Sequence, residues 1–106
     1  DAHYAPRTPM RLVPTGQLAQ VIDQLKASGN SVGFLAYSAF AALVPPHSLR
    51  QLPDDPEGYA RGLYAALREL DQAGNDLIVV EAIPMGANWS AIADRLRRAA
   101  CGSGSA

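Results

Sequence analysis

The chain has 106 residues, of which 48% are hydrophobic and 18% are charged, and its net charge at pH 7 is −1. This length fits one domain that buries a core without support from metals or disulfides. The small net charge argues against non-specific nucleic-acid binding, which needs an excess of Lys and Arg. No apolar run approaches the roughly 20 residues that a membrane span needs, and no signal-peptide pattern is present.

The single cysteine and the two ends of the sequence carry further expectations. Cys101 stands alone, so an intramolecular disulfide is excluded and we expect a reducing, cytoplasmic location. The sequence opens at Asp1 without an initiator Met, which suggests a piece of a longer protein. Residues 102–106, GSGSA, have the composition of a flexible tail.

Residues 1–9 are predicted to be a connector between domains. Pro6 and Pro9 each push the preceding residue toward extended geometry, and the segment has little periodicity. Residues 10–13 then form a short predicted strand. We therefore place the domain itself over residues 10–101.

A helix and a second strand follow. Thr15 is the predicted N-cap of a helix through Ser28, and Gly29 ends it. The apolar face of this helix consists of Leu18, Val21, Ile22 and Leu25. Residues 31–37, SVGFLAY, are predicted to be a strand, in which Gly33 indicates close approach of another backbone segment.

Residues 38–54 are the least regular part of the sequence. Pro45 and Pro46 forbid regular strand pairing at their own positions. Residues 47–52 fit a short third strand, but the pattern leaves open whether this strand forms.

The clearest folding unit is residues 59–81, which are predicted to form a helix, a tight turn and a strand. Asp55 is the predicted N-cap and Pro56 the first helical residue, where no backbone N–H is needed. Gly74 supplies a left-handed stop. Residues 77–80 are apolar without alternation, which predicts a strand that is covered on both faces.

A last helix is predicted from Asn88, as its N-cap, to Ala100. Its apolar face consists of Trp89, Ile92, Leu96 and Ala99. The order of elements is β-α-β-(β)-α-β-α. This order predicts a single α/β domain with a mostly parallel sheet and helices on both faces of the sheet.

The common catalytic and cofactor patterns are absent. The sequence has no GxGxxG, no GxxxxGK[ST] and no GxSxG motif. His3 and His47 have no Cys, Asp or Glu at ligand spacing, so we expect no metal site. We therefore assign no catalytic residue and expect no cofactor in this chain.

Two other groups of residues are candidates for a role. Gly86, Ala87 and Asn88 follow a buried strand and lead into a helix, where N–H groups and the helix dipole attract anions. The alternative for this loop is an ordinary helix cap. Arg95 lies three residues after Ile92, so we expect it to reach a carboxylate and to form a structural ion pair with Asp71. Two isolated carboxylates, Asp71 and Asp94, are not evidence for acid–base chemistry.

The stretch His3-Tyr4-Ala5-Pro6 lies in the connector, where no core explains its aromatic and polar side chains. A segment stiffened by proline is suited to covering a ligand that is held by a partner surface. We therefore expect this stretch to act together with another domain.

Three stretches resemble one protein family. The stretch from His3 to Pro6 is similar to the linker motif that follows the catalytic domain in Sua5-type threonylcarbamoyl-AMP synthases. Residues 63–71 and 76–81 resemble the signature helix and strand of their C-terminal Sua5 domain, and residues 91–100 resemble its closing helix. The three occur in the family's order, and the resemblance covers nearly the whole chain.

This resemblance implies a Rossmann-like fold and a place in a larger enzyme. The parent would carry an N-terminal YrdC-like catalytic domain on the same polypeptide, absent from this chain. That domain would use ATP with Mg²⁺ to condense L-threonine and bicarbonate into threonylcarbamoyl-AMP, releasing pyrophosphate, for the t6A37 modification of tRNA. We expect no direct contact between the present domain and tRNA or a membrane.

The resemblance also implies a role for the connector. In the family the linker passes over the catalytic cavity and gates it, so the present domain would be a non-catalytic regulatory or lid domain. On this analogy His3, Tyr4 and Pro6 would lie nearest the substrates, with Tyr4 the best candidate for a covering contact. Many members have basic residues before this His, whereas Asp1 and Ala2 stand here, which weighs against a phosphate contact.

Two other functions stay open on the residues alone. One is a free-standing nucleotide- or anion-binding domain that uses the loop of residues 86–88. The other is a docking module that uses the exposed part of residues 38–47.

Overall fold

Four parallel strands form the centre of the computed structural model, which describes residues 4–38 and 44–104. They are β1 (Met10–Val13), β2 (Val32–Ala36), β3 (Leu49–Gln51) and β4 (Leu77–Glu81). Their order across the sheet is β1-β4-β2-β3, and each pair of neighbours is parallel. The predicted α/β fold with a parallel sheet is confirmed, and the third strand that the sequence left open does form.

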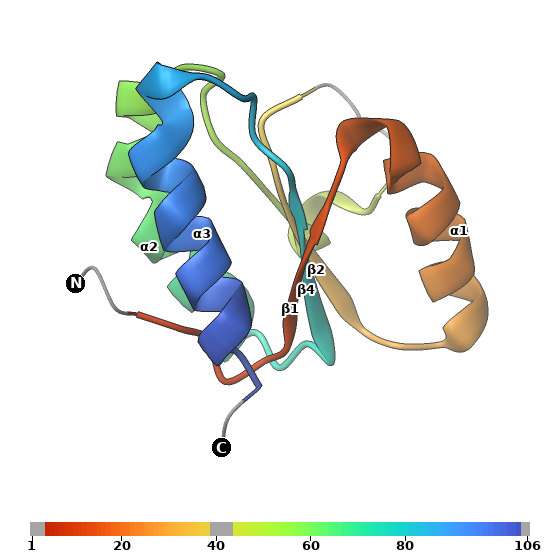
Figure 1. Ribbon diagram of the computed structural model, residues 1–106. Coiled ribbons are helices and arrows are strands. Elements are labelled where there is room, and N and C mark those ends of the chain that lie inside the picture. Colours follow the sequence, from red (N-terminus) through yellow and green to blue (C-terminus); the bar gives the residue numbers. More distant parts are fainter. Residues whose placement is uncertain (1–3, 39–43, 105–106) are drawn as a thin grey trace.

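Three helices cover this sheet. They are α1 (Leu18–Ser28), α2 (Pro56–Gln72) and α3 (Ser90–Gly102). Helix α1 lies on one face of the sheet, whereas α2 and α3 lie side by side on the other (Figure 1). Within the described residues, no helix is long and apolar enough to cross a membrane.

Strand β4 is the middle of the core. Ile78 and Val80 pack with the side chains of α2 and α3, while Val79 packs with those of α1. All three side chains are fully buried. The run of apolar residues without alternation therefore has the predicted cause, which is a helix layer on each face of the strand.

Helix α2 begins and ends as its sequence predicts. The Asp55 carboxylate accepts a hydrogen bond of 2.7 Å from the backbone N–H of Gly58, and Pro56 is the first helical residue. Gly74, just beyond the helix, has φ 79°. A residue with a Cβ would be strained in this left-handed conformation, so glycine is the residue that lets the chain turn toward β4 here.

The starts of the other two helices differ from the prediction. Neither Thr15 nor Asn88 caps its helix with its side chain. A short 3₁₀ turn precedes each helix instead, over Thr15–Gln17 before α1 and over Ala87–Trp89 before α3. The tighter turns begin the spiral earlier, so each predicted cap lies inside a turn and its side chain is directed elsewhere.

Tight packing closes the amino end of β2. A Cβ on Gly33 would lie 2.6 Å from Nδ2 of Asn75 and 3.0 Å from Cδ2 of Leu70. Asn75 donates to the carbonyl of Leu70 at 2.9 Å and accepts from the Ser31 hydroxyl at 3.1 Å. The close approach at Gly33 is present, but the approaching atoms belong to side chains and not to another backbone segment as predicted; the nearest side chain, Asn75, lies in the turn between α2 and β4.

The carboxyl-terminal end of the domain extends further than its composition predicts. Helix α3 runs through Gly102, and the Ser103 hydroxyl donates to the carbonyl of Ala100 at 2.7 Å. Residues 102–104 of the predicted tail are therefore part of the folded domain. Gly-Ser composition favours flexibility only where tertiary contacts do not hold the chain.

Candidate functional site

One carboxylate binds the connector to helix α2. Asp71 accepts hydrogen bonds from the N–H groups of Arg7 and Thr8 at 3.2 and 2.9 Å. It also accepts from the hydroxyls of Thr8 at 2.7 Å and Tyr4 at 3.1 Å. Each carboxylate oxygen receives two of these four donors. From Tyr4 onward, the predicted connector is thus fastened to the domain.

Asp71 has an unusual place for an acid, because it lies in the last turn of α2. The carbonyl end of a helix carries a partial negative charge, which disfavours a carboxylate there, and this turn contains no basic residue. Burial would raise the pKa of Asp71, but the hydrogen bonds from Thr8, Arg7 and Tyr4 outweigh that effect and hold its pKa below the usual value. The connector therefore stabilises a charge that the helix alone disfavours.

The end of α3 holds the connector from its other side. The carbonyl of Pro6 accepts a hydrogen bond from the N–H of Gly104 at 3.2 Å. The N–H of Met10 donates to the Ser103 hydroxyl oxygen at 2.9 Å. The connector runs along the side of the molecule that α2 and α3 cover, and the chain returns to the same side at its end (Figure 1).

Tyr4 and Ala5 add packing contacts to these bonds. The Tyr4 ring stands edge-on to the ring of Tyr64, with 6.1 Å between centroids and 83° between planes. Burial, the hydrogen bond to Asp71 and the charge of that residue together raise the pKa of Tyr4 to about 12. A Cβ on Gly102 would lie only 3.1 Å from the Cβ of Ala5, so the connector passes close to α3.

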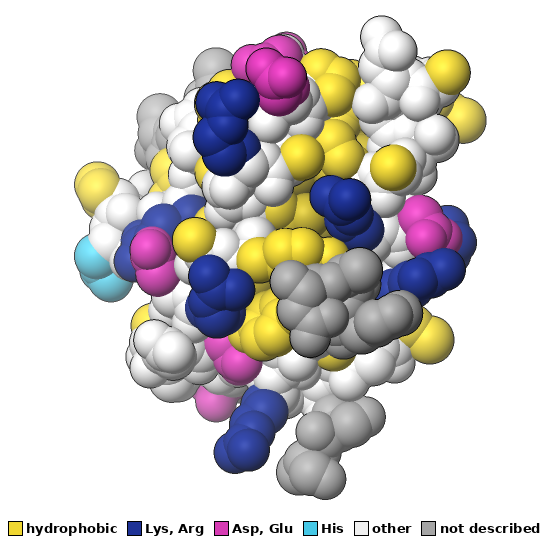
Figure 2. Space-filling view, turned by 90° about the vertical axis from the view of Figure 1, so that its left-hand side faces the viewer, with side chains coloured by type: hydrophobic (Ala, Val, Ile, Leu, Met, Phe, Trp, Pro, Cys, Tyr) yellow, Lys and Arg dark blue, Asp and Glu magenta, His cyan; other side chains and the backbone are white. Residues whose placement is uncertain are grey.

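The side of the molecule that carries the connector has a band of apolar surface among charged side chains of both signs (Figure 2). Half-buried apolar side chains that pack against the core under α2 and α3 include Tyr4, Ala60 and Ala100. The connector therefore crosses a surface that is apolar as well as hydrogen-bonding.

The residues predicted for the connector are only partly described. Tyr4, Ala5 and Pro6 take part in the contacts above, whereas His3 lies outside the described residues. The same holds for half of the segment 38–47 that was considered for docking, because residues 39–43 are not described.

The predicted ion pair between Asp71 and Arg95 does not form between these two described residues. Asp71 is occupied by the connector, and two other arginines of α3 pair with an acid on their own helix. Asp94 pairs with Arg97, and with Arg98 at 3.1 Å. These partners lie three and four residues away on the same helix, where side chains are neighbours by geometry. Whether two separate helices place their charges together cannot be judged from spacing.

A second carboxylate joins the carboxyl ends of three strands. Glu81 is the last residue of β4, and its side chain is fully buried. It accepts from the N–H groups of Tyr37 and Ser38, each at 3.0 Å, and from the Thr15 hydroxyl at 2.7 Å. Thr15 follows β1, and Tyr37 and Ser38 follow β2. One side chain thus links β1, β2 and β4 where they end.

These strand ends are the topological switch point of the sheet. The chain leaves β1 toward α1 on one face and leaves the neighbouring β4 toward α3 on the other. Open α/β sheets commonly bind ligands at such a point. Here a buried carboxylate occupies it, and its negative charge opposes the binding of an anion beside it.

The sequence analysis did not predict a role for Glu81, although the position of this acid in the sequence indicates one. An acid that directly follows four apolar residues, at the end of a strand that is buried on both faces, will itself be buried. A buried carboxylate without hydrogen-bond donors lowers the stability of the fold, so its presence predicts nearby donors. The sequence could not show which residues donate to it, because these donors come after β1 and β2, far from Glu81 along the chain.

Aromatic side chains surround this carboxylate. The ring of Trp89 lies 5.5 Å from that of Tyr59 and 6.3 Å from that of Tyr37, measured between centroids. Burial, and then the charge of Glu81 and the nearby Tyr37, raise the pKa of Tyr59 well above its usual range. The Tyr59 hydroxyl is buried without a hydrogen-bond partner among the described residues. This region therefore stays apolar around a single charge.

The predicted anion-binding loop has a regular helix-start geometry. Gly86 has φ 132°, and its carbonyl accepts from the N–H of Trp89 at 3.1 Å, which closes the turn over residues 87–89. Arg97 lines a shallow hollow beside the loop but is paired with an acid of its own helix. Anion binding by Gly86, Ala87 and Asn88 stays a prediction.

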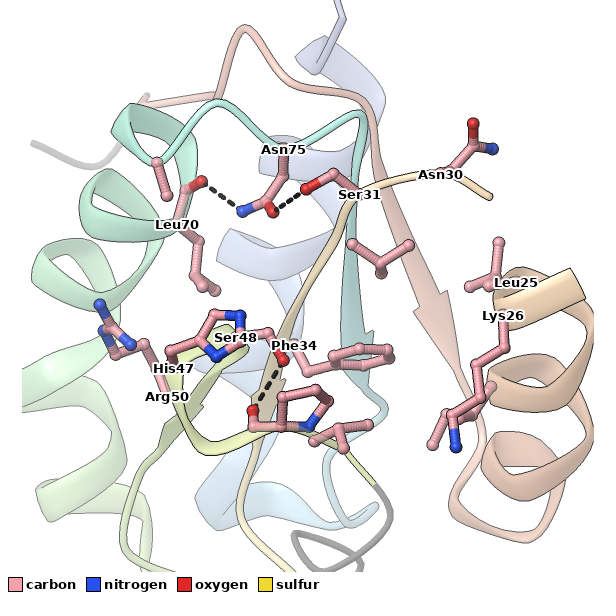
Figure 3. A pocket seen from close by; sticks show the side chains of 15 residues that line it. Leu25, Lys26, Asn30, Ser31, Phe34, His47, Ser48, Arg50, Leu70 and Asn75 are labelled. Carbon is pink, nitrogen blue, oxygen red and sulfur yellow. Dashed lines mark hydrogen bonds between the residues drawn. The ribbon is translucent and has the colours of Figure 1, made fainter. Parts of the chain in front are cut away.

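A cavity of about 370 Å³ lies between α1 and the β3 edge of the sheet (Figure 3). Its apolar lining includes Ile22, Leu25, Phe34 and Val44. Its polar groups are largely engaged in the wall: Ser31 bonds Asn75, Ser48 bonds a backbone carbonyl, and Arg50 pairs with Glu69 at 2.6 Å. Within the described part of the chain, no three His, Cys, Asp or Glu side chains gather as a metal site requires.

The comparison with known families decides where the chain belongs. Residues 1–101 match the family described as threonylcarbamoyl-AMP synthase, C-terminal domain. The chain belongs to this family. The match includes the connector as well as the sheet and helices, so the threonylcarbamoyl-AMP synthase C-terminal domain comprises both regions described above.

Relatives from two archaea show the same fold. The threonylcarbamoyl-AMP synthase of Pyrococcus abyssi (strain GE5 / Orsay) is 31% identical over 103 residues, which cover 92% of this chain and 29% of the relative. A crystal structure of P. abyssi Sua5 complexed with L-threonine has a TM-score of 0.77 and 27% identity, covering 93% of this chain and 30% of that one. A variant of P. abyssi Sua5, in which a histidine and the next tyrosine are both alanine, has a TM-score of 0.76, 25% identity and coverages of 91% and 28%.

The third solved structure has nearly the extent of the present chain. It is the C-terminal Sua5 domain of a Pyrococcus horikoshii protein, with a TM-score of 0.69 and 24% identity, covering 88% of this chain and 93% of that one. By contrast, the present chain spans only about a third of P. abyssi Sua5, 29% and 30% in the two comparisons.

Proposed function

We propose that this chain is the non-catalytic C-terminal lid domain of an L-threonylcarbamoyladenylate synthase. The whole enzyme would condense L-threonine, bicarbonate and ATP into threonylcarbamoyl-AMP and pyrophosphate. A YrdC-like catalytic domain on the same polypeptide would hold ATP with Mg²⁺ and carry out the reaction. The product would serve the t6A37 modification of tRNA in the cytoplasm.

The fixation of the connector is the observation that carries this proposal. Four hydrogen bonds to Asp71 and two to residues 103 and 104 hold the connector on the domain. A regulatory domain acts on a neighbour only if the segment between them transmits its position. A connector whose described residues, from Tyr4 onward, are bonded to the domain can do this, whereas a flexible linker would let the two parts move independently.

The P. abyssi structures support the same proposal from the side of the substrate. One contains L-threonine, and another replaces an adjacent histidine and tyrosine. In the present sequence His3 and Tyr4 are the one adjacent His–Tyr pair, and they stand at the start of the connector. We infer that the start of the connector, where this pair and Pro6 stand, lies next to the substrate site of the catalytic domain.

The alternative of a nucleotide-binding domain is disfavoured by Glu81. In a sheet of this type a nucleotide phosphate would bind beyond the strand ends, next to the helix start. A buried carboxylate lies there instead and repels a second negative charge. The loop of residues 86–88 would therefore have to bind an anion without help from the switch point.

Pyrophosphate release tests the division of labour between the domains. The full-length synthase and the present chain alone are each incubated with ATP, L-threonine and bicarbonate. We expect release by the full-length protein and none by the chain, because no residue in the described part of the chain is placed for acyl or nucleotidyl transfer. Release by the chain alone would contradict the proposal.

Two further measurements separate the lid from the alternatives. Deleting this domain from the full-length protein should slow threonylcarbamoyl-AMP formation, and an unchanged rate would argue against a lid. Calorimetric titration of the isolated chain with ATP should show no submillimolar binding. Tight nucleotide binding by the isolated chain would favour the free-standing nucleotide-binding function.

A further inference from the structure

The hydrogen bonds of Asp71 all point away from the helix that carries it. Every donor that the structure gives to this carboxylate comes from Tyr4, Arg7 or Thr8. The helix gains nothing from an acid in its last turn, where the dipole disfavours negative charge. The side chain therefore serves the connector and not the helix.

Two of the four donors are backbone N–H groups of consecutive residues, Arg7 and Thr8. A carboxylate that accepts two successive N–H groups fixes the path of the main chain, and not only the position of one side chain. The Thr8 hydroxyl adds a third bond from the same short stretch, and Thr8 is only 8% exposed. Asp71 thus sets the direction in which the connector crosses α2.

Contacts with the end of α3 hold the same segment of the chain from its other side. Pro6 and Met10 are bonded to Gly104 and Ser103, beyond the end of α3. A segment held at both sides moves together with the domain. Any bending between this domain and a neighbour then takes place outside residues 4–10, which these contacts hold.

We propose, on the basis of the lid function above, that Asp71 is a positioning residue for the reaction. It fixes connector residues 4–8 on the domain and thereby sets how the domain is held against the catalytic domain that binds the substrate. Tyr4 then acts as an anchor of the connector, because its hydroxyl is bonded to Asp71 and its ring packs on Tyr64. This anchoring role differs from the covering contact that the family resemblance implies for Tyr4.

Hydrogen exchange of the chain tests the anchor without any reaction. The variant Asp71→Asn keeps the size of the side chain but removes its charge and one acceptor oxygen. Asp23→Asn is the matched control, since Asp23 is an exposed acid on α1, on the opposite face of the sheet. Losing hydrogen bonds to a charged acceptor should speed exchange of the Arg7 and Thr8 amides about tenfold or more, while the amides of β4 stay protected in both variants.

Kinetics of the full-length synthase test the consequence for the reaction. With Asp71→Asn we expect the KM for L-threonine to rise about tenfold, with a smaller change in kcat, because the connector covers the substrate without touching the reacting atoms. Asp23→Asn should leave both constants unchanged. A purely structural role of Asp71 would lower the amount of folded enzyme and leave KM unchanged.

The outcomes distinguish this inference from the function on which it rests. Amide exchange at residues 7 and 8 no faster than in Asp23→Asn would overturn the anchor. Faster exchange with unchanged KM would keep the anchor but overturn the positioning role of Asp71, whereas the lid function itself fails if deleting the whole domain leaves the rate unchanged. If Asp71→Asn fails to fold, Thr8→Val removes one donor and keeps the carboxylate, and it should speed exchange at Arg7 by a smaller factor; no change there would also overturn the anchor.

Discussion

Two acidic side chains organise this molecule in different ways. Asp71 and Glu81 each collect hydrogen bonds from chain segments that are far away in sequence. Glu81 is fully buried and bonds residues that follow β1 and β2, so it joins parts of the sheet to one another. Asp71 is half-buried on α2, and its donors all lie in the connector, so it joins the domain to the segment that precedes it.

The difference teaches which contacts support the fold and which support its use. A buried carboxylate whose donors lose their acceptor leaves several unsatisfied groups inside the protein, and folding as a whole suffers. A carboxylate at the surface that holds one segment can be lost while the core stays intact. We therefore expect damage at Glu81 to unfold the domain and damage at Asp71 to release the connector.

The largest effect is expected for Glu81→Ala. The N–H groups of Tyr37 and Ser38 and the hydroxyl of Thr15 would lose a charged acceptor in a buried place, so unfolding should become easier by about 3–5 kcal/mol. Urea denaturation followed by Trp89 fluorescence measures this change. Glu57→Ala is the control, because the Glu57 side chain is 89% exposed and its ion pair is worth about 0.5 kcal/mol. Equal losses in the two variants would contradict the structural role of Glu81.

A medium effect is expected at the amino end of the sheet, where packing and not charge closes the structure. In Gly33→Ala the new methyl group would meet Asn75 at 2.6 Å, and overpacking of this kind costs about 1–3 kcal/mol. Gly16→Ala is the matched control, since no atom lies within 4 Å of a Cβ there. Thermal unfolding of the two variants makes the comparison. If Gly33→Ala were as stable as Gly16→Ala, the packing at the amino end of the sheet would tolerate an added methyl group, and the expected effect would be contradicted.

The smallest effect is expected when the pH is lowered. It concerns the contribution of Asp71 to the free energy of unfolding. The pKa of Asp71 is lower in the folded chain than its usual value of 3.8, so the unfolded chain binds the proton more tightly. The stabilisation is therefore fully present above the usual value and is lost as pH falls through the folded pKa.

This sign gives a direct measurement. The difference in unfolding free energy between the unchanged chain and Asp71→Asn should be constant near neutral pH and shrink toward about pH 2. Denaturation at several pH values, with Asp23→Asn as control, follows this difference. A difference that grows on acidification would mean that the connector binds the protonated carboxyl, and it would contradict the charge-assisted contact.

Much of the fold was predictable because its signals are local. The cap at Asp55, the stop at Gly74 and the unbroken apolar run of β4 depend on residues that are near one another in sequence. The tight place at Gly33 was predictable as well, although its partner Asn75 was not. The two helix starts at Thr15 and Asn88 were predicted wrongly, because a 3₁₀ turn and a side-chain cap use the same residue types.

The candidate site was predictable only in part. The connector and its His–Tyr pair were found because a proline-stiffened segment with aromatic residues has no packing reason of its own. The partner of Asp71 was assigned to Arg95, since opposite charges are the simplest expectation for an isolated acid. The donors are in fact two backbone N–H groups and two hydroxyls, which no charge pattern reveals.

The sequence by itself determined the order of the elements, the parallel sheet with helices on both faces, and the family to which the chain belongs. Spacing and caps act over a few residues, and the family motifs are read in order along the chain. Only the tertiary structure decided what the two acids do. The donors of Asp71 lie 63 to 67 residues away, and those of Glu81 lie 43 to 66 residues away. Residue spacing cannot predict contacts over such separations. The donors and the carboxylates come together only when the strands and helices pack against one another.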